Sequence, residues 1–391
     1  MTKTKLILPI IVISQFCCTS LWFAGNGVMS DLVKDFHLNN AALGHLTSAV
    51  QFGFIVGTLL FALLTIADRF SPSKVFFISA LFGALFNLGT ILPINSLASL
   101  IFFRFMVGFF LAGIYPVGMK IAADYYDKGL GKSLSFLVGA LVIGTAFPHL
   151  IKAYSTGLPW ISVLVFTSSI AFFGGLILVL LVPNGPYRKR SQALDFTALF
   201  KVFKNVNFRS AAFGYFGHMW ELYTFWAFIP VLLTFYSKLN PATQFNVPFL
   251  SFLIIGLGGL SCVFGGYISQ RKGIKNTAFT ALLLSCICCV ISPIIFYTKM
   301  PSVLVAFLIF WGLVVIADSP LFSTLVAQNV DTEIKGTALT IVNCIGFTIT
   351  ILSIQLINLL IGYWTPKYVF TILAIGPLFG LIALYKNRNL S

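Results

Sequence analysis

The stretch ADRFSPSK at residues 67–74 has a counterpart in the stretch GYISQRKGIK at residues 266–275. Each is a short basic turn that follows the second long apolar run of its half of the chain. Turns of the same character at the same place in each half are the sequence signature of an internal repeat. These two stretches therefore predict a fold made of two similar halves.

A second correspondence lies further along each half. In the first half, Pro116 in the fourth apolar run precedes Gly131, at the start of the fifth run, by 15 residues. In the second half, Pro320 precedes Gly336 by 16 residues. Because this match falls at the equivalent run of each half, it strengthens the prediction of a repeat.

The apolar runs are long enough to cross a membrane. A transmembrane helix needs about 20 mostly apolar residues to cross roughly 30 Å of hydrocarbon, and it satisfies its own backbone hydrogen bonds there. Twelve such runs fill the chain, at residues 6–29, 41–66, 74–94, 98–123, 131–152, 159–182, 209–235, 247–269, 276–298, 301–326, 336–362 and 367–385. We therefore predict an all-α integral membrane protein with twelve transmembrane helices.

The longest polar connection divides these runs evenly. It follows residue 182 and ends near residue 208, with six runs on each side. We predict an N-terminal six-helix bundle at residues 1–187, a cytoplasmic linker at 188–208, and a C-terminal six-helix bundle at 209–391. The two bundles should be related by pseudo-symmetry.

The composition agrees with a membrane protein and excludes a soluble one. Of 391 residues, 58% are hydrophobic and 9% are charged, whereas soluble domains carry about 25% charged residues. The net charge of +15 could indicate a nucleic-acid partner, but the basic residues lie between apolar runs. With a cytoplasmic N-terminus, 18 of the 25 lysines and arginines fall inside and 5 outside. By the positive-inside rule, we expect an inner (plasma) membrane protein with both termini cytoplasmic.

Two features could suggest a different interpretation. The seven cysteines all lie within apolar runs, so we interpret them as small packing residues rather than disulfide partners or metal ligands. The first run could be a signal peptide, but its apolar stretch from Leu6 to Met29 is too long for one. We expect an uncleaved first span, no metal and no cofactor.

The turn after the second span resembles a family motif. In the major facilitator superfamily of secondary transporters, this loop typically reads G-x-L-a-D-R-x-G-R-K. Asp68 and Arg69 fit it, and Lys74 falls one place beyond the final lysine. Arg104 and Gly108 in span four resemble the family's R-x-x-x-G pattern. The resemblance extends over essentially the full chain.

The chain also departs from the family's motifs. Leu64 and Ser71 replace the glycines of the first loop, and the second copy has Gln270 where the family often has aspartate. The glycines and proline of span five match the antiporter motif only loosely. The family's nitrate/nitrite carriers use an arginine in spans two and eight, and neither span contains one here.

The resemblance implies a mechanism. Spans 1, 4, 7 and 10 would line a central cavity, and the two halves would rock to open it alternately to each side. It also implies that Asp68, Arg69 and, in the second copy, Arg271 form a conformational gate. A solvated turn that merely anchors the span is the alternative for Asp68 and Arg69.

Acidic residues in the predicted spans are candidates for transport chemistry, because an ionisable group at mid-membrane is usually paired or faces a cavity. Glu221 lies near the middle of span seven, one helical turn after His218, so the two can share a face. Asp318 in span ten precedes Ser319 and Pro320, and the proline can break the helix. These residues predict a proton-coupling or substrate-binding site, and buried contacts that brace helices are the alternative.

Span four supplies the cations. Helical spacing places Arg104, Gly108 and Tyr115 on one stripe, so Arg104 could hold an anionic group or pair with an acid. Lys120 lies on the opposite stripe, and it either contacts the solute or extends toward the cytoplasmic interface.

Polar and aromatic residues complete the candidate set. Gln15, Thr19, Trp22 and Asn26 form one polar stripe on span one, which either packs against another helix or lines the cavity. Gln51 in span two is a weaker candidate. Trp311, seven residues before Asp318, should share its face and could clasp a ring or a cation.

From these observations we predict a proton-coupled secondary transporter for a small anionic or zwitterionic organic solute. Its expected partners are the solute, protons and the lipid bilayer, with no nucleic acid, and we expect a monomer. A proton-driven multidrug exporter is the alternative within this class, and a solute sensor that transports nothing is a less favoured one. An enzyme is not expected, because the sequence contains no H-E-x-x-H, Gly-x-Ser-x-Gly or glycine-rich phosphate motif.

Overall fold

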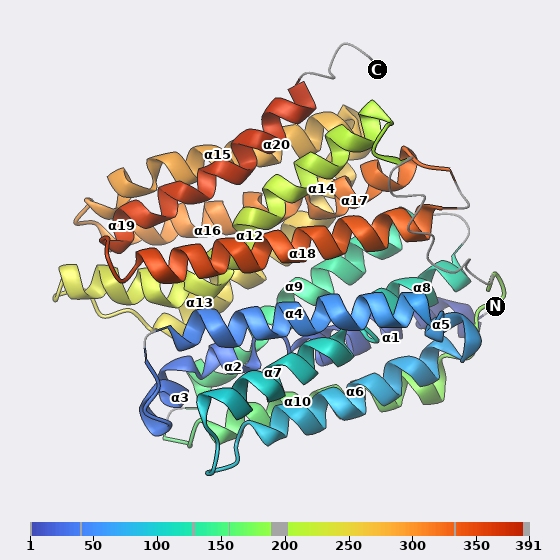
Figure 1. Ribbon diagram of the computed structural model, residues 1–391, viewed down its shortest axis with the longest axis horizontal. Coiled ribbons are helices and arrows are strands. Elements are labelled where there is room, and N and C mark those ends of the chain that lie inside the picture. Colours follow the sequence, from blue (N-terminus) through green and yellow to red (C-terminus); the bar gives the residue numbers. More distant parts are fainter. Residues whose placement is uncertain are drawn as a thin grey trace. The chain divides into compact units, whose positions relative to one another are not determined.

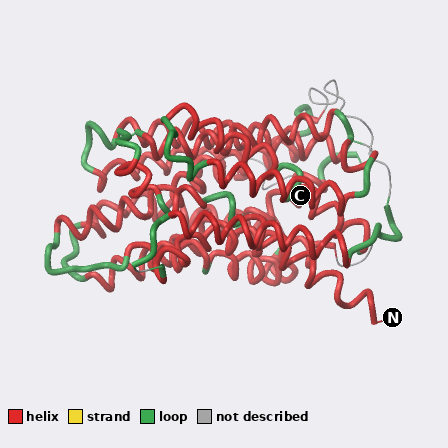
Figure 2. Tube along the Cα trace, turned by 90° about the horizontal axis from the view of Figure 1, so that it is seen from below, coloured by secondary structure: helices red, strands yellow, loops and turns green. Residues whose placement is uncertain are grey.

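The computed structural model describes residues 2–39, 41–126, 130–155, 157–188, 202–331 and 334–385. Within these ranges the secondary structure is entirely helical (Figure 2). Among the described residues, eleven helical segments, some of them interrupted, are long and apolar enough to span a membrane, and Leu6–Thr19 is a shorter apolar helix. These twelve elements match the twelve predicted spans, so the predicted fold class is confirmed.

The chain forms two compact units, Met1–Leu194 and Asp195–Ser391. The division between them falls inside the segment expected to be the linker. Most of that segment, residues 189–201, lies outside the described residues. The exact bounds of the two bundles and the linker therefore stay a prediction.

The first unit contains six spans and several short helices, labelled in Figure 1. Its elements are α1 Thr2–Thr19, α2 Ala24–Gly27, α3 Met29–Asp35, α4 Ala42–Leu63, α5 Ile66–Arg69, α6 Pro72–Gly89, α7 Leu97–Leu111, α8 Tyr115–Tyr125, α9 Leu130–Tyr154 and α10 Ile161–Leu181. Helix α4 packs along α7, α6 packs along α10, and α1 contacts both α9 and α10.

Glycine allows the closest of these contacts. A Cβ atom on Gly53 of α4 would collide with the carbonyl oxygen of Phe105 on α7, and one on Gly108 of α7 would collide with that of Val50 on α4. The two backbones therefore touch where each presents a glycine. Small residues at helix interfaces stabilise membrane proteins in this way, because they let packing and polar contacts act at short range.

The second unit also contains six spans. Its elements are α12 Val206–Leu239, α13 Val247–Gly256, α14 Gly258–Lys272, α15 Ile274–Phe296, α16 Pro301–Ala317, α17 Ser319–Gln328, α18 Lys335–Leu360, α19 Pro366–Val369, the 3₁₀ helix η1 Phe370–Ala374 and α20 Ile375–Tyr385. Helix α12 lies against α18 and α20 (Figure 1), and α15 lies against α16.

Several spans are interrupted, and two of the breaks occupy equivalent places. In the fourth span of each unit, a proline stands in the first turn of the second segment: Pro116 in α8 and Pro320 in α17. Proline lacks the N–H that would continue the preceding helix. The break between α7 and α8 interrupts the continuous stripe that the sequence predicts for Arg104, Gly108 and Tyr115.

Candidate functional site

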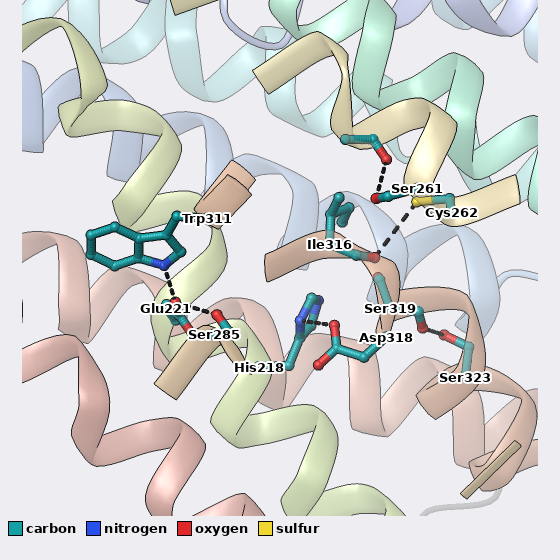
Figure 3. A network of polar contacts seen from close by, with 11 residues as sticks. His218, Glu221, Ser261, Cys262, Ser285, Trp311, Ile316, Asp318, Ser319 and Ser323 are labelled. Atoms are coloured by element: carbon teal, nitrogen blue, oxygen red, sulfur yellow. Dashed lines mark hydrogen bonds and ion pairs between the residues drawn. The ribbon is translucent and has the colours of Figure 1, made fainter. Parts of the chain in front are cut away.

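The break between α16 and α17 places a carboxylate against α12 (Figure 3). Asp318 is the single residue between these two helices. Its Oδ1 lies 2.8 Å from Nδ1 of His218, and both side chains are 1% exposed. The predicted acid of span ten and the predicted histidine of span seven therefore form a buried pair. Such a pair can hold a proton away from water.

Glu221 occupies a second buried position on α12, one turn after His218. Its Oε1 accepts hydrogen bonds from Trp311 Nε1 at 2.6 Å, Ser285 Oγ at 2.5 Å and Cys289 Sγ at 3.3 Å. The residue is 1% exposed, and its Oε2 has no hydrogen-bond partner within the described residues. One carboxylate oxygen is thus fixed by three donors, and the other is available to bind a proton.

The structure gives the polar partners that helical spacing alone does not. His218 and Glu221 lie one turn apart on α12, but His218 pairs with Asp318 and Glu221 accepts from α15 and α16 (Figure 3). Trp311 is predicted to share the face of Asp318, and its indole donates to Glu221. Phe225, one turn after Glu221, packs on Trp311 with ring centroids 4.5 Å apart. An aromatic wall therefore flanks the carboxylate.

A separate polar network lies in the first unit, around Arg104. Nη1 donates to the carbonyl of Leu21 at 3.3 Å and to Asn87 Oδ1 at 3.2 Å. Nη2 donates to the carbonyls of Leu21 at 3.3 Å and Trp22 at 2.5 Å. The residue is 1% exposed, and no ion pair involves it within the described residues. Arg104 therefore binds two carbonyls of the turn that follows α1.

Asn87 connects this network to a third helix. Its Nδ2 donates to Leu164 O at 3.3 Å, Thr167 Oγ1 at 3.3 Å and Ser168 Oγ at 3.0 Å, all on α10. Since its Oδ1 accepts from Arg104, one amide links α6, α7 and α10. A fully satisfied network of this kind fixes the arrangement of its helices.

The polar residues after the α1 break face helix α4. The Trp22 ring packs on Phe54 with centroids 4.9 Å apart, and Asn26 Nδ2 donates to Thr47 Oγ1 at 2.8 Å. Gln51 lies between Thr47 and Phe54 on α4 and is 0% exposed. Neither amide atom of Gln51 has a hydrogen-bond partner in the described part of the chain.

The remaining candidates lie near the proposed gate or on the surface. Lys120 Nζ forms an ion pair with Asp68 Oδ1 at 2.8 Å, so this lysine joins the predicted gate. Arg188 Nη2 donates to the carbonyl of Asp68 at 2.9 Å, which attaches the chain after α10 to the same turn. Arg69 and Arg271 are exposed, and Tyr115 begins α8.

Sequence reasoning did not assign Ser285, Cys289 or Asn87 to the site. Their only signal is polarity within an apolar span, and the cysteines are expected there as packing residues. It also missed His149 of α9, which is 3% exposed and whose Nε2 has no partner among the described residues. Neutral polar residues of a span can thus belong to a buried network together with ionisable ones.

Comparison with known proteins identifies the family. The model of the Major Facilitator Superfamily matches residues 11–354. The chain belongs to this superfamily. Membership of the superfamily identifies the chain as a multi-pass membrane transporter.

Individual members of the superfamily are similar over different lengths. The niacin transporter NiaP of Acinetobacter baylyi is 31% identical over 160 residues, which is 35% of this chain and 36% of the relative. The match thus spans about a third of that relative's length. The solved nucleoside transporter NupG superposes with a TM-score of 0.74 at 18% identity and covers 98% of this chain and 100% of its own. The proton:xylose symporter XylE superposes with a TM-score of 0.76 at 13% identity, and the match covers 98% of this chain and 96% of XylE. These two likenesses show the fold alone.

Proposed function

We propose that the protein is a proton-coupled secondary transporter that moves a small anionic or zwitterionic organic solute by alternating access. The observation that carries this proposal is a pair of buried acidic sites in the second unit. Glu221 lies on α12, and Asp318, between α16 and α17, pairs with His218 one turn before Glu221; all three side chains are removed from water. Ionisable groups at this depth are costly, and in transporters they serve as proton relays or substrate ligands.

The hydrogen bonds around Glu221 suit a proton carrier. Three donors fix Oε1, and Oε2 has no partner among the described residues. A proton on Oε2 neutralises the carboxylate without disturbing its three contacts. Charge neutralisation lowers the cost of moving the group through a low-dielectric environment. Proton binding can thereby favour one conformation of the second unit over another.

The solute class rests on the buried acids of the second unit and on one relative. A buried carboxylate suits a positive group on a zwitterionic solute. The relative named as a niacin transporter supports small organic acids as the first candidates, since niacin is a pyridine carboxylate. The excess of basic residues in alternate loops supports an inner membrane location with both termini cytoplasmic.

We assign different roles to the two cations of span four. Arg104 holds the carbonyls at the end of α1, so it acts as a positioning residue for Trp22 and Asn26. Lys120 acts with Asp68 in the gate, together with the exposed Arg69 and Arg271. The gate residues should affect how fast the conformations interconvert and not which solute binds.

Transport by purified protein in liposomes tests the proton step. An inward proton gradient should drive accumulation of the solute in the wild type, and collapse of the gradient with a protonophore should abolish it. In Glu221→Gln the amide keeps an oxygen for the three donors but cannot take up a proton. This variant should lose gradient-driven accumulation by about tenfold or more and retain solute counterflow, which needs no net proton movement.

Asp331→Asn is the matched control, because Asp331 is exposed and lies outside this network. It should behave as the wild type in both assays. If wild-type uptake ignores the gradient, the protein is not proton-coupled. If Glu221→Gln keeps full gradient-driven accumulation, the proton is carried elsewhere.

A proton-driven multidrug exporter is the second candidate. The observation that favours it is the aromatic wall of Trp311 and Phe225 beside Glu221, which suits a hydrophobic cation. Deletion or overexpression in the source cell distinguishes the two candidates. An exporter should change susceptibility to several unrelated cationic compounds, whereas a solute carrier should change growth on its own substrate only.

A further inference from the structure

An open cleft with a volume of about 560 Å³ lies at the end of α3 in the first unit. Small-molecule sites typically enclose about 300–1,000 Å³. The cleft is lined by Lys34, Asp35, Phe36 and His37 from the end of α3, by Ile91 after α6, and by Trp160 before α10. Three separate segments therefore meet around one space, away from the residues assigned above to transport.

The cleft contains one acid held by a hydrogen bond and two basic residues that form no ion pair among the described residues. Asp35 Oδ2 accepts a hydrogen bond from Trp160 Nε1 at 2.6 Å, which fixes the acid beside the indole ring. Asp31, one turn earlier, is paired with Lys152 at 2.8 Å. Lys34 and His37 are exposed, and no ion pair involves either in the described part of the chain. The cleft thus offers N–H donors for an anion next to a fixed carboxylate for a cation.

The chain turns sharply at His37, at the edge of the cleft. His37 has φ of +50° and is one of two non-glycine residues with positive φ among the described residues. Asn, Asp and His adopt this left-handed conformation more readily than other side chains. The turn after α3 keeps His37 in the lining of the cleft together with Lys34.

Aromatic and apolar residues form the base and flanks of the cleft. Phe36 and Trp160 meet edge to face with ring centroids 6.2 Å apart and pack on a buried apolar cluster of the same unit. Next to the lining residues in sequence, Ile94 is 89% exposed and Leu158 is 61% exposed. Aromatic residues at span ends mark the level of the lipid head groups, and exposed apolar residues there contact acyl chains.

We propose that this cleft binds the zwitterionic head group of a phospholipid, as in phosphatidylethanolamine. Lys34 and His37 hold the phosphate, and Asp35 holds the ammonium against the faces of Phe36 and Trp160. The exposed Ile94 and Leu158 lie along the acyl chains. Under the proposed orientation, α3 follows the first span on the side opposite the termini, so the lipid comes from the outer leaflet.

Native mass spectrometry of the purified full chain in detergent tests this proposal. Phosphatidylethanolamine, phosphatidylglycerol of the same chain length, and glycerophosphoethanolamine, which lacks acyl chains, are titrated separately. Phosphatidylethanolamine should bind the wild type most tightly. Lys34→Gln should weaken binding of both lipids about fivefold, since one basic residue near a head group contributes about 1 kcal/mol.

Asp35→Asn separates the zwitterion from a simple anion. The amide oxygen can still accept from Trp160, so the fold is retained, but the negative charge is lost. This variant should lose the preference for phosphatidylethanolamine over phosphatidylglycerol and still bind both. Lys238→Gln, which changes an exposed lysine in the last turn of α12, is the matched control and should bind as the wild type.

Three results would overturn the proposal. Equal wild-type affinity for the two lipids would mean that the ammonium is not recognised. Unchanged binding in Lys34→Gln would place the lipid elsewhere. Binding of glycerophosphoethanolamine as tight as that of the intact lipid would make the cleft a site for a soluble solute.

Discussion

Replacement of Arg104 by methionine is the sharpest test of what this buried arginine does. Methionine keeps much of the length and the apolar stem of the side chain but removes every donor. In the structure these donors serve the carbonyls of Leu21 and Trp22 and the amide oxygen of Asn87. We therefore expect Arg104→Met to loosen the junction between α1 and α2 rather than to remove a solute contact.

The expected magnitude follows from the hydrogen bonds that are lost. The carbonyl of Leu21 also accepts from Ala24 N at 3.4 Å, so the main losses are the bonds to Trp22 O and Asn87 Oδ1. Each costs about 1–3 kcal/mol, so their sum is about 2–6 kcal/mol. The variant also no longer buries a guanidinium without an acid, which offsets part of this cost. The net effect should be a loss of about 1–3 kcal/mol in the free energy of unfolding.

Reversible unfolding by dodecyl sulfate in mixed micelles measures this loss. Arg104→Lys should lie between the wild type and the methionine variant, because an ammonium can donate to some of the same acceptors. Arg69→Met is the control, since Arg69 is exposed and should shift the unfolding free energy by less than about 0.5 kcal/mol.

Transport kinetics distinguish a positioning role of Arg104 from a role as a solute ligand. As a positioning residue, Arg104 should affect transport of every accepted solute together. A variant that unfolds like the wild type but loses affinity only for anionic solutes would refute this reasoning. Arg104 would then be a solute ligand.

Two further predictions concern Gln51 and the gate. Gln51→Leu removes an amide whose two polar atoms are buried and have no partner among the described residues. It should therefore stabilise the protein by about 1–2 kcal/mol. A loss of stability in the same micelle assay would show that the amide braces the fold. Lys120→Gln breaks the ion pair with Asp68, so in liposomes it should change the maximum transport rate with little effect on apparent affinity. If the two residues act as a pair, the double variant with Asp68→Asn should change the rate as much as Lys120→Gln alone. Additive changes in the double variant would contradict this.

Much of the fold could be predicted because hydropathy is a local property of the chain. A span must be a continuous apolar segment, so its position is visible in the sequence whatever it packs against. The break at Asp318 was also predictable, since Pro320 acts on its own backbone. Pro116 carries the same signal in span four, and the break there separates Tyr115 from Arg104, so the stripe expected for an ideal helix does not continue through this span.

The contacts within the candidate site were harder to predict from the sequence. Helical spacing says which residues share a face, but not how the helix is rotated or which helix it meets. The spacing predicts that His218 shares a face with Glu221 and that Trp311 shares one with Asp318, but it does not predict that His218 pairs with Asp318 or that Trp311 donates to Glu221. Ser285 and Cys289 carry no charge, so the sequence offered no reason to connect them with Glu221.

The sequence by itself determined that this protein lies in a membrane, crosses it with twelve helices and repeats one six-helix plan, because each of these properties follows from the chain taken segment by segment. Only the tertiary structure decided which polar groups meet. Glu221 finds Ser285 and Trp311 at separations of 64 and 90 residues, and Arg104 finds the carbonyl of Leu21 at a separation of 83. The physical reason is that a buried polar group must bond to whatever the packed helices bring within about 3 Å, and that choice depends on all the helices together.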